Sequence, residues 1–187
     1  MRIKEIIQEV EQIKLSKAKG TLDTGIYTEK DIIKYRQAKQ ISTIPTGQQV
    51  FKGTDKSGST YYYAVSPDTT RIEISVRGIE KNNVLSKIYL QANKGNTLTA
   101  ADFYHWLIVK HNLTLVADMQ TSGGHNVWKA LQRDHRDVNI HGWLRGKPVN
   151  INMKDDEYTH GPGYYKDEKV PQELKDASDM LLVAHKK

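Results

Sequence analysis

The segment from Gln91 to Thr97 has residues suited to binding a phosphate group. It lies between an expected strand and an expected helix, and a helix N-terminus offers unpaired amide groups and a positive dipole end. Gly95 would let the backbone approach an anion closely, and Lys94 adds a positive charge. An ordinary strand-to-helix connection with a glycine turn has the same residues, so this segment alone leaves both interpretations open.

A second polar loop begins at Asp118, after a nearly all-apolar run, and enters a helix through Ser122. Ligands of α/β sheets bind beyond the carboxyl ends of such buried strands. Ser122 is equally suited to being a simple N-cap. Trp128 has the helical spacing of a core residue, and we expect it in the core.

The chain has seven histidines and no cysteine. The histidines form no HxxxH or HxH spacing, which are the patterns that place two imidazoles on one metal ion. We therefore expect no metal site. The histidines are His105, His111, His125, His135, His141, His160 and His185.

The tyrosine run at residues 61–63 lies near Arg71, Arg77 and Lys81 in the sequence. Aromatic rings beside basic side chains can stack on single-stranded nucleic acid. Packing within a strand explains the same rings more simply. The net charge of +6 permits a nucleic-acid partner or a phosphate-bearing cofactor without requiring either.

Two helices and then a set of strands are expected before these segments. Apolar residues at helical spacing predict a helix over residues 3–15, and Thr28 begins a second helix that ends near Ala38. Residues 40–90 have the signals of an antiparallel meander, including a polar loop at residues 54–59 and a turn at residues 80–83. Alternation at Ile72, Ile74 and Val76 predicts one buried face.

The pattern changes after Gln91 to strands that alternate with helices. Thr99 begins an apolar helix, residues 113–117 form a buried strand, and residues 138–143 form the next strand after a second helix. We expect the strand ending near Gln91 and the strand at 113–117 to be parallel neighbours joined by the first helix. The apolar run Met180–Ala184 should pair with residues 138–143 and close the sheet.

In this order, the segments 95–108, 113–118 and 120–131 resemble those of the GNAT superfamily of N-acyltransferases, most of all the divergent GNAT-like proteins common in bacteriophage genomes. The likeness covers roughly residues 60–187. It implies an α/β (α+β) fold with a mixed, mostly antiparallel sheet and helices on both faces. The whole chain, 1–187, would be one domain, with a helical part at 1–40, antiparallel strands at 41–90 and a cofactor-side βαβαβ half at 91–187.

The resemblance also implies acetyl-CoA or another acyl-CoA as cofactor, with its pyrophosphate on the loop amides. Asp118 is the candidate carboxylate that takes a proton from the amine. Tyr89 and Tyr104 are the candidate hydroxyl groups, with Tyr104 the one we assign, and either residue is equally suited to being part of the core. Glu73 and Glu80 are the other available carboxylates, and each of the three is equally suited to being a solvated surface charge or a capping charge. The residues implied in cofactor binding are Leu90, Gln91, Lys94, Gly95, Asn96, Thr97 and Asn126.

Two departures from the family pattern bear on activity. The family loop reads Gln or Arg, two residues, Gly, one residue, then Gly or Ala, whereas here the spacing differs and Asn96 follows the glycine. Trp128 occupies the position where the family often has a tyrosine that protonates the departing thiolate, and an indole cannot serve as that acid.

Two functions follow from these observations. The first is acyl-CoA-dependent N-acyltransfer to a small-molecule or protein amine, by an enzyme encoded in a phage or mobile element. The second is a non-catalytic GNAT-like phage protein, either a virion component or a factor that binds a host protein or nucleic acid. No apolar run approaches the ~20 residues of a membrane span. A basic chain of 187 residues without cysteine fits one cytoplasmic domain, or a virion protein.

Overall fold

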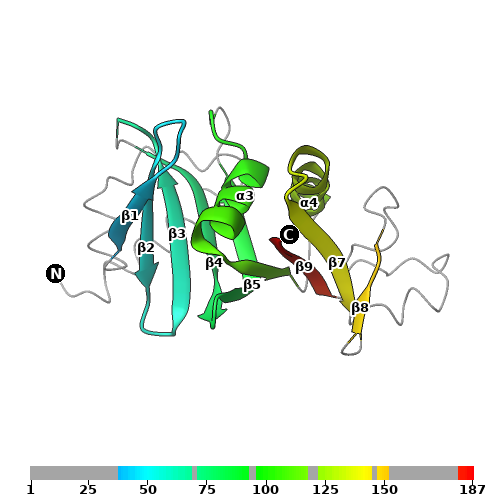
Figure 1. Cartoon of the computed structure of the whole chain (residues 1–187). Coiled ribbons are helices and arrows are strands. Elements are labelled where there is room, and N and C mark those ends of the chain that lie inside the picture. The colour runs from blue at the N-terminus through cyan, green and yellow to red at the C-terminus, as the bar shows by residue number, and fades with distance from the viewer. Residues whose placement is uncertain (1–37, 69–70, 93–95, 118–121, 145–146, 152–180) are drawn as a thin grey trace. The chain divides into compact units, whose positions relative to one another are not determined.

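The computed structural model describes residues 38–68, 71–92, 96–117, 122–144, 147–151 and 181–187 (Figure 1). The expected N-terminal helices lie outside these residues, apart from Ala38. The chain divides into two compact units, and β4 and β5 contribute to both. The first unit contains residues up to Arg77 together with Leu90–Thr99, and the second contains Gly78–Tyr89 and residues from Ala100 onward.

The described residues form nine strands in the sheet order β1-β2-β3-β4-β5-β6-β9-β7-β8, and two helices. The strands are β1 Lys39–Thr43, β2 Gln49–Thr54, β3 Ser59–Val65, β4 Ile72–Lys81, β5 Val84–Ala92, β6 Thr114–Ala117, β7 Val138–Leu144, β8 Lys147–Val149 and β9 Leu181–Lys186. The helices are α3 Ala100–His111 and α4 Ser122–Asp134. Of the helices that the structure describes, none is long and apolar enough to cross a bilayer.

The first unit is built on the hairpin of β2 and β3, which was expected from the polar loop between them. Asp55 organises this loop by accepting hydrogen bonds from the backbone amides of Ser57 and Ser59 and from the Tyr61 hydroxyl. Burial alone would raise the pKa of Asp55, but the hydrogen bonds from Ser57, Tyr61 and Ser59 together hold it below its usual value. Gly58 has a φ of 81°, which favours glycine.

The tyrosine run lies in β3, which is buried along its whole length. Tyr61 and Tyr63 stack with ring centroids 6.0 Å apart, and they share a core with Phe51, Val65 and Ile72. All three tyrosine rings are buried. Strand packing therefore accounts for the run, because buried rings offer no face on which a base could stack.

The second unit contains the crossover predicted from the sequence. β5 and β6 are parallel, with Val84 opposite Thr114 and Leu85 opposite Leu115, and α3 joins them. Asn112 has a φ of 52°, the left-handed conformation that commonly ends a helix and redirects the chain. The prediction of a parallel pair joined by the first helix is confirmed.

β9, red in Figure 1, lies between β6 and β7 and is antiparallel to both. Ala184 is opposite Leu115 on one side and Ile140 on the other. The prediction that the C-terminal apolar run pairs with the strand at 138–143 is confirmed. The short strand β8 was not predicted from the sequence.

The expectation of an α/β fold with helices on both faces of the sheet, as in GNAT proteins, is wrong. The described residues are dominated by the nine-stranded sheet and contain two helices, which contact each other. The alternation of strands and helices after Gln91 contributes only α3 and α4 to the described residues. The turn at Asn82 and Asn83, both with positive φ, joins β4 to β5 directly, with no helix between the two strands.

Candidate functional site

The predicted cofactor residues are distributed over several elements. Leu90 and Gln91 are half-buried near the end of β5, and Asn126 lies on the exposed side of α4. Lys94, Gly95 and the predicted base Asp118 lie outside the described residues.

Asn96 and Thr97 belong to a buried polar network in the first unit. Gln48, fully buried, donates hydrogen bonds from Nε2 to Glu73 Oε2 at 3.1 Å and to Thr97 Oγ1 at 2.8 Å. Asn96 donates from Nδ2 to the Glu73 carbonyl oxygen at 2.6 Å. These bonds hold the segment before α3 against β4, so both residues have a structural role whether or not they contact a ligand.

Glu73 is only 2% exposed and lies within β4, so the interpretation as a solvated surface or capping charge is wrong. The Glu73 carboxylate lies 3.7 Å from the guanidinium of Arg71, the residue just before β4. It also accepts the hydrogen bond from Gln48. A buried carboxylate needs such partners, because isolated charge is costly inside a protein.

The predicted catalytic hydroxyl, Tyr104, lies in the core between the two helices. It is 4% exposed, and its ring meets Trp128 edge-on with centroids 5.8 Å apart. Burial raises the pKa of Tyr104 far above its usual value, which makes the hydroxyl a weak proton donor. Trp128 is a core residue, as expected.

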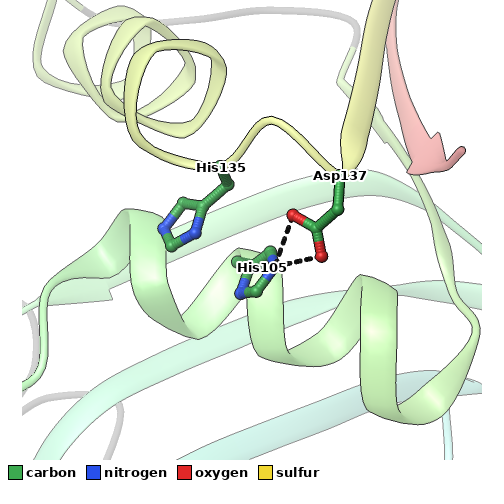
Figure 2. Close-up of side chains that lie close together, drawn as sticks. All are labelled: His105, His135 and Asp137. Atoms are coloured by element: carbon green, nitrogen blue, oxygen red, sulfur yellow. Dashed lines mark hydrogen bonds and ion pairs between the residues drawn. The ribbon is translucent and has the colours of Figure 1, made fainter.

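A cluster of titratable side chains lies on the surface of the second unit. His105 projects from α3, while His135 and Asp137 come from the turn between α4 and β7 (Figure 2). His105 Nε2 lies 2.9 Å from both carboxylate oxygens of Asp137. The two imidazole rings stack with centroids 4.0 Å apart and planes 11° apart.

The local backbone explains why His135 and Asp137 project together. The His135 amide donates to the Leu131 carbonyl oxygen at 3.1 Å, which ends α4, and the Val138 amide donates to the His135 carbonyl oxygen at 3.2 Å. This tight turn leads directly into β7. A fourth residue, Asp102 in the first turn of α3, places Oδ1 at 3.0 Å from His135 Nε2.

Each imidazole therefore has its own carboxylate. The hydrogen bond from His105, opposed by a smaller effect of burial, holds the pKa of Asp137 below its usual value. The side chains of His105 and His135 are 27% and 16% exposed, so both are open to small solutes. Paired imidazoles and carboxylates at this spacing can move protons or bind a metal ion.

Sequence reasoning missed this cluster. Short spacing between two histidines does not reveal it, because His135 and Asp137 are two residues apart in a turn and the second histidine, His105, comes from α3. The available signal was the run Asp134-His135-Arg136-Asp137, which has a histidine and two aspartates within four residues.

The chain was compared with models of protein families, with curated proteins and with solved structures, and none of them matches it.

Proposed function

We propose that the chain binds an acyl-CoA and transfers its acyl group to an amine. The observation that carries this proposal is the β5–α3–β6 crossover, a parallel strand pair joined by one helix. The two registered residue pairs lie at the amino-terminal ends of both strands. Parallel strands of this kind bind ligands beyond their carboxyl ends, and the free amides at the start of the connecting helix favour a phosphate group.

The reaction makes modest chemical demands. The amine nitrogen attacks the thioester carbonyl carbon, the C–N bond forms, the C–S bond breaks, and the proton lost by the amine balances the one gained by the CoA thiolate. Asp118 remains the proposed acceptor of the amine proton. Because Tyr104 is buried and Trp128 has no acidic proton, we assign protonation of the thiolate to solvent.

Titration calorimetry with acetyl-CoA tests the cofactor proposal. Lys94→Ala should weaken binding only severalfold, because backbone amides would hold most of the phosphate. Gly95→Asp should weaken it on the order of a hundredfold, because a carboxylate beside a pyrophosphate costs several kcal/mol. Gly58→Asp is the matched control, a glycine-to-aspartate change in the loop between β2 and β3, and it should leave the affinity unchanged. No binding to the wild-type protein at millimolar acetyl-CoA would show that the proposal is wrong.

A second candidate function is acyl-CoA binding, or binding of another partner, without catalysis. The edge-on contact of Tyr104 with Trp128 favours it, since both side chains are buried and Trp128 takes the position where the enzymes that the sequence resembles often have a reactive tyrosine. Release of free CoA thiol, measured with a panel of small amines and lysine peptides, separates the two. Binding of acetyl-CoA without any thiol release supports the non-catalytic function.

A further inference from the structure

We propose that His105, His135 and Asp137 bind a divalent transition-metal ion of the zinc type. Each residue offers one ligand atom, and these atoms all lie within 4.8 Å of one another. The site belongs entirely to the second unit and does not depend on acyl-CoA binding.

The pair formed by His105 and Asp137 is close to a coordinating arrangement. The distance from His105 Nε2 to either Asp137 oxygen is 2.9 Å. In a tetrahedral zinc site, with bonds of about 2.0–2.2 Å, a nitrogen and an oxygen ligand lie roughly 3.4 Å apart. An ion can therefore replace the proton between these two groups if they separate by a few tenths of an ångström.

His135 supplies the third ligand, and Asp102 orients its imidazole ring by a hydrogen bond. The hydrogen bond from His135 Nε2 to Asp102 Oδ1, at 3.0 Å, leaves the lone pair on Nδ1 for a metal ion. Metal-binding histidines almost always donate their other N–H group to a carboxylate, a carbonyl oxygen or water in this way. The four residues thus match three ligands and one positioning carboxylate.

The ligand types decide the class of ion. Two imidazoles with one carboxylate suit Zn²⁺ and its neighbours, whereas Mg²⁺ and Ca²⁺ prefer sites made of oxygen ligands alone. Three protein ligands leave at least one position for water or another ligand, as in sites where zinc is not purely structural. The half-exposed carboxylate of Asp137 gives the ion access from solvent.

A plain surface cluster is the competing explanation. In that case the two histidine–aspartate hydrogen bonds only tie α3 to the turn before β7, and the stacked rings contribute packing. This explanation predicts that the substitutions below change stability without changing any affinity for metal ions.

The test uses untagged, full-length protein freed of metal with a chelator and titrated calorimetrically with Zn²⁺ at pH 7.5. We expect one ion per chain, with no comparable binding of Mg²⁺. His105→Ala and Asp137→Asn should abolish this binding. Asp102→Asn should weaken it by about 10–100-fold, the effect typical of losing a carboxylate that orients a ligand. His185→Gln, a histidine outside the cluster, is the matched control and should leave it unchanged.

The proposal is overturned if the wild-type protein takes up no Zn²⁺ at micromolar concentrations, or if His185→Gln loses as much affinity as His105→Ala. Should the alanine variant fail to fold, the Co²⁺-loaded wild-type protein provides an independent measurement. A visible absorption spectrum of four- or five-coordinate Co²⁺, lost in Asp137→Asn, supports the site, and a spectrum of six-coordinate, hydrated Co²⁺ contradicts it.

Discussion

At the scale of single residues, the most informative side chains are buried polar groups. Gln48 and Glu73 are both buried, and they satisfy each other together with Arg71, Asn96 and Thr97. Hydrogen-bonded networks of this kind hold a unique arrangement only while every member is present, because an unsatisfied buried group is costly.

Gln48→Ala should therefore destabilise the protein by about 2–4 kcal/mol, since it leaves a cavity and removes a donor from the buried Glu73 carboxylate. Thr97→Val removes one acceptor of the same amide at an exposed position and should cost about 1 kcal/mol. Urea unfolding of both variants measures the difference. A smaller loss for Gln48→Ala than for Thr97→Val would contradict this account of the network.

His141 predicts a dependence of stability on pH. Burial, and then the nearby charge of His185 at a ring distance of 5.4 Å, lower the pKa of His141 below its usual value. The folded state then binds fewer protons than the unfolded state. The contribution of His141 to the free energy of unfolding therefore has its full value above the unfolded pKa of ~6.5, and it is lost as the pH falls below that value. His141→Gln should reduce this fall between pH 7 and pH 5, measured by urea unfolding at each pH, and His185→Gln should reduce it less. A fall of the same size in wild type and His141→Gln would show that other groups cause it.

At the scale of elements, the strands come close enough for one glycine to be required. A Cβ atom added at Gly78 in β4 would lie 2.6 Å from the Ser86 carbonyl oxygen and 2.9 Å from Leu85 Cδ1. The first of these atoms belongs to the backbone of β5, so it cannot move away by a change of side-chain rotamer. The spacing of β4 and β5 in the second unit therefore depends on the absence of a side chain at this position.

Gly78→Ala should destabilise the protein by about 1–3 kcal/mol or more, because the clash forces β4 and β5 apart. Gly58→Ala is the matched control. Its Cβ would meet open space, so only the positive φ contributes, at about 1–2 kcal/mol. Thermal unfolding followed by circular dichroism measures both, and equal melting temperatures for Gly78→Ala and wild type would refute the close approach.

At the scale of the whole molecule, the last strand has a central position in the second unit. β9 bonds to β6 on one side and to β7 on the other, although it comes from the C-terminus. Leu182 and Ala184 of β9 are buried. A chain that lacks β9 must leave two strands with unpaired edges and an exposed apolar surface.

Deletion of the residues after Ser178 should therefore lower the melting temperature by ~10 °C or more, or prevent folding, since several buried side chains and two ladders of hydrogen bonds are lost together. Lys186→Ala, at an exposed position of the same strand, should change the melting temperature by no more than a degree or two, as surface substitutions do. A truncated protein that melts like the full chain would show that β9 is dispensable.

The sequence by itself determined the features whose turn residues and apolar runs are recognisable locally, including some in which the paired strands are far apart in the chain. Polar loops predicted the hairpin of β2 and β3, an apolar run predicted the pairing of β9, and the spacing of helix and strand signals predicted the parallel crossover through α3. These features depend on turn residues and hydrophobic periodicity, which are readable within a short window of sequence. The balance of sheet and helix could not be predicted in this way, because the crossover pattern describes only the segment from β5 to β6 and not the other described strands.

Only the tertiary structure decided which distant polar groups meet. His105 and Asp137 are 32 residues apart in the chain, and Gln48 and Thr97 are 49 residues apart, yet each pair forms a hydrogen bond. Tyr104 has a hydroxyl group that could take part in proton transfer, but its side chain is buried in the core. The sequence states which groups can ionise or donate, whereas their burial and their partners depend on how the elements pack, and those two properties decide what chemistry a group can do.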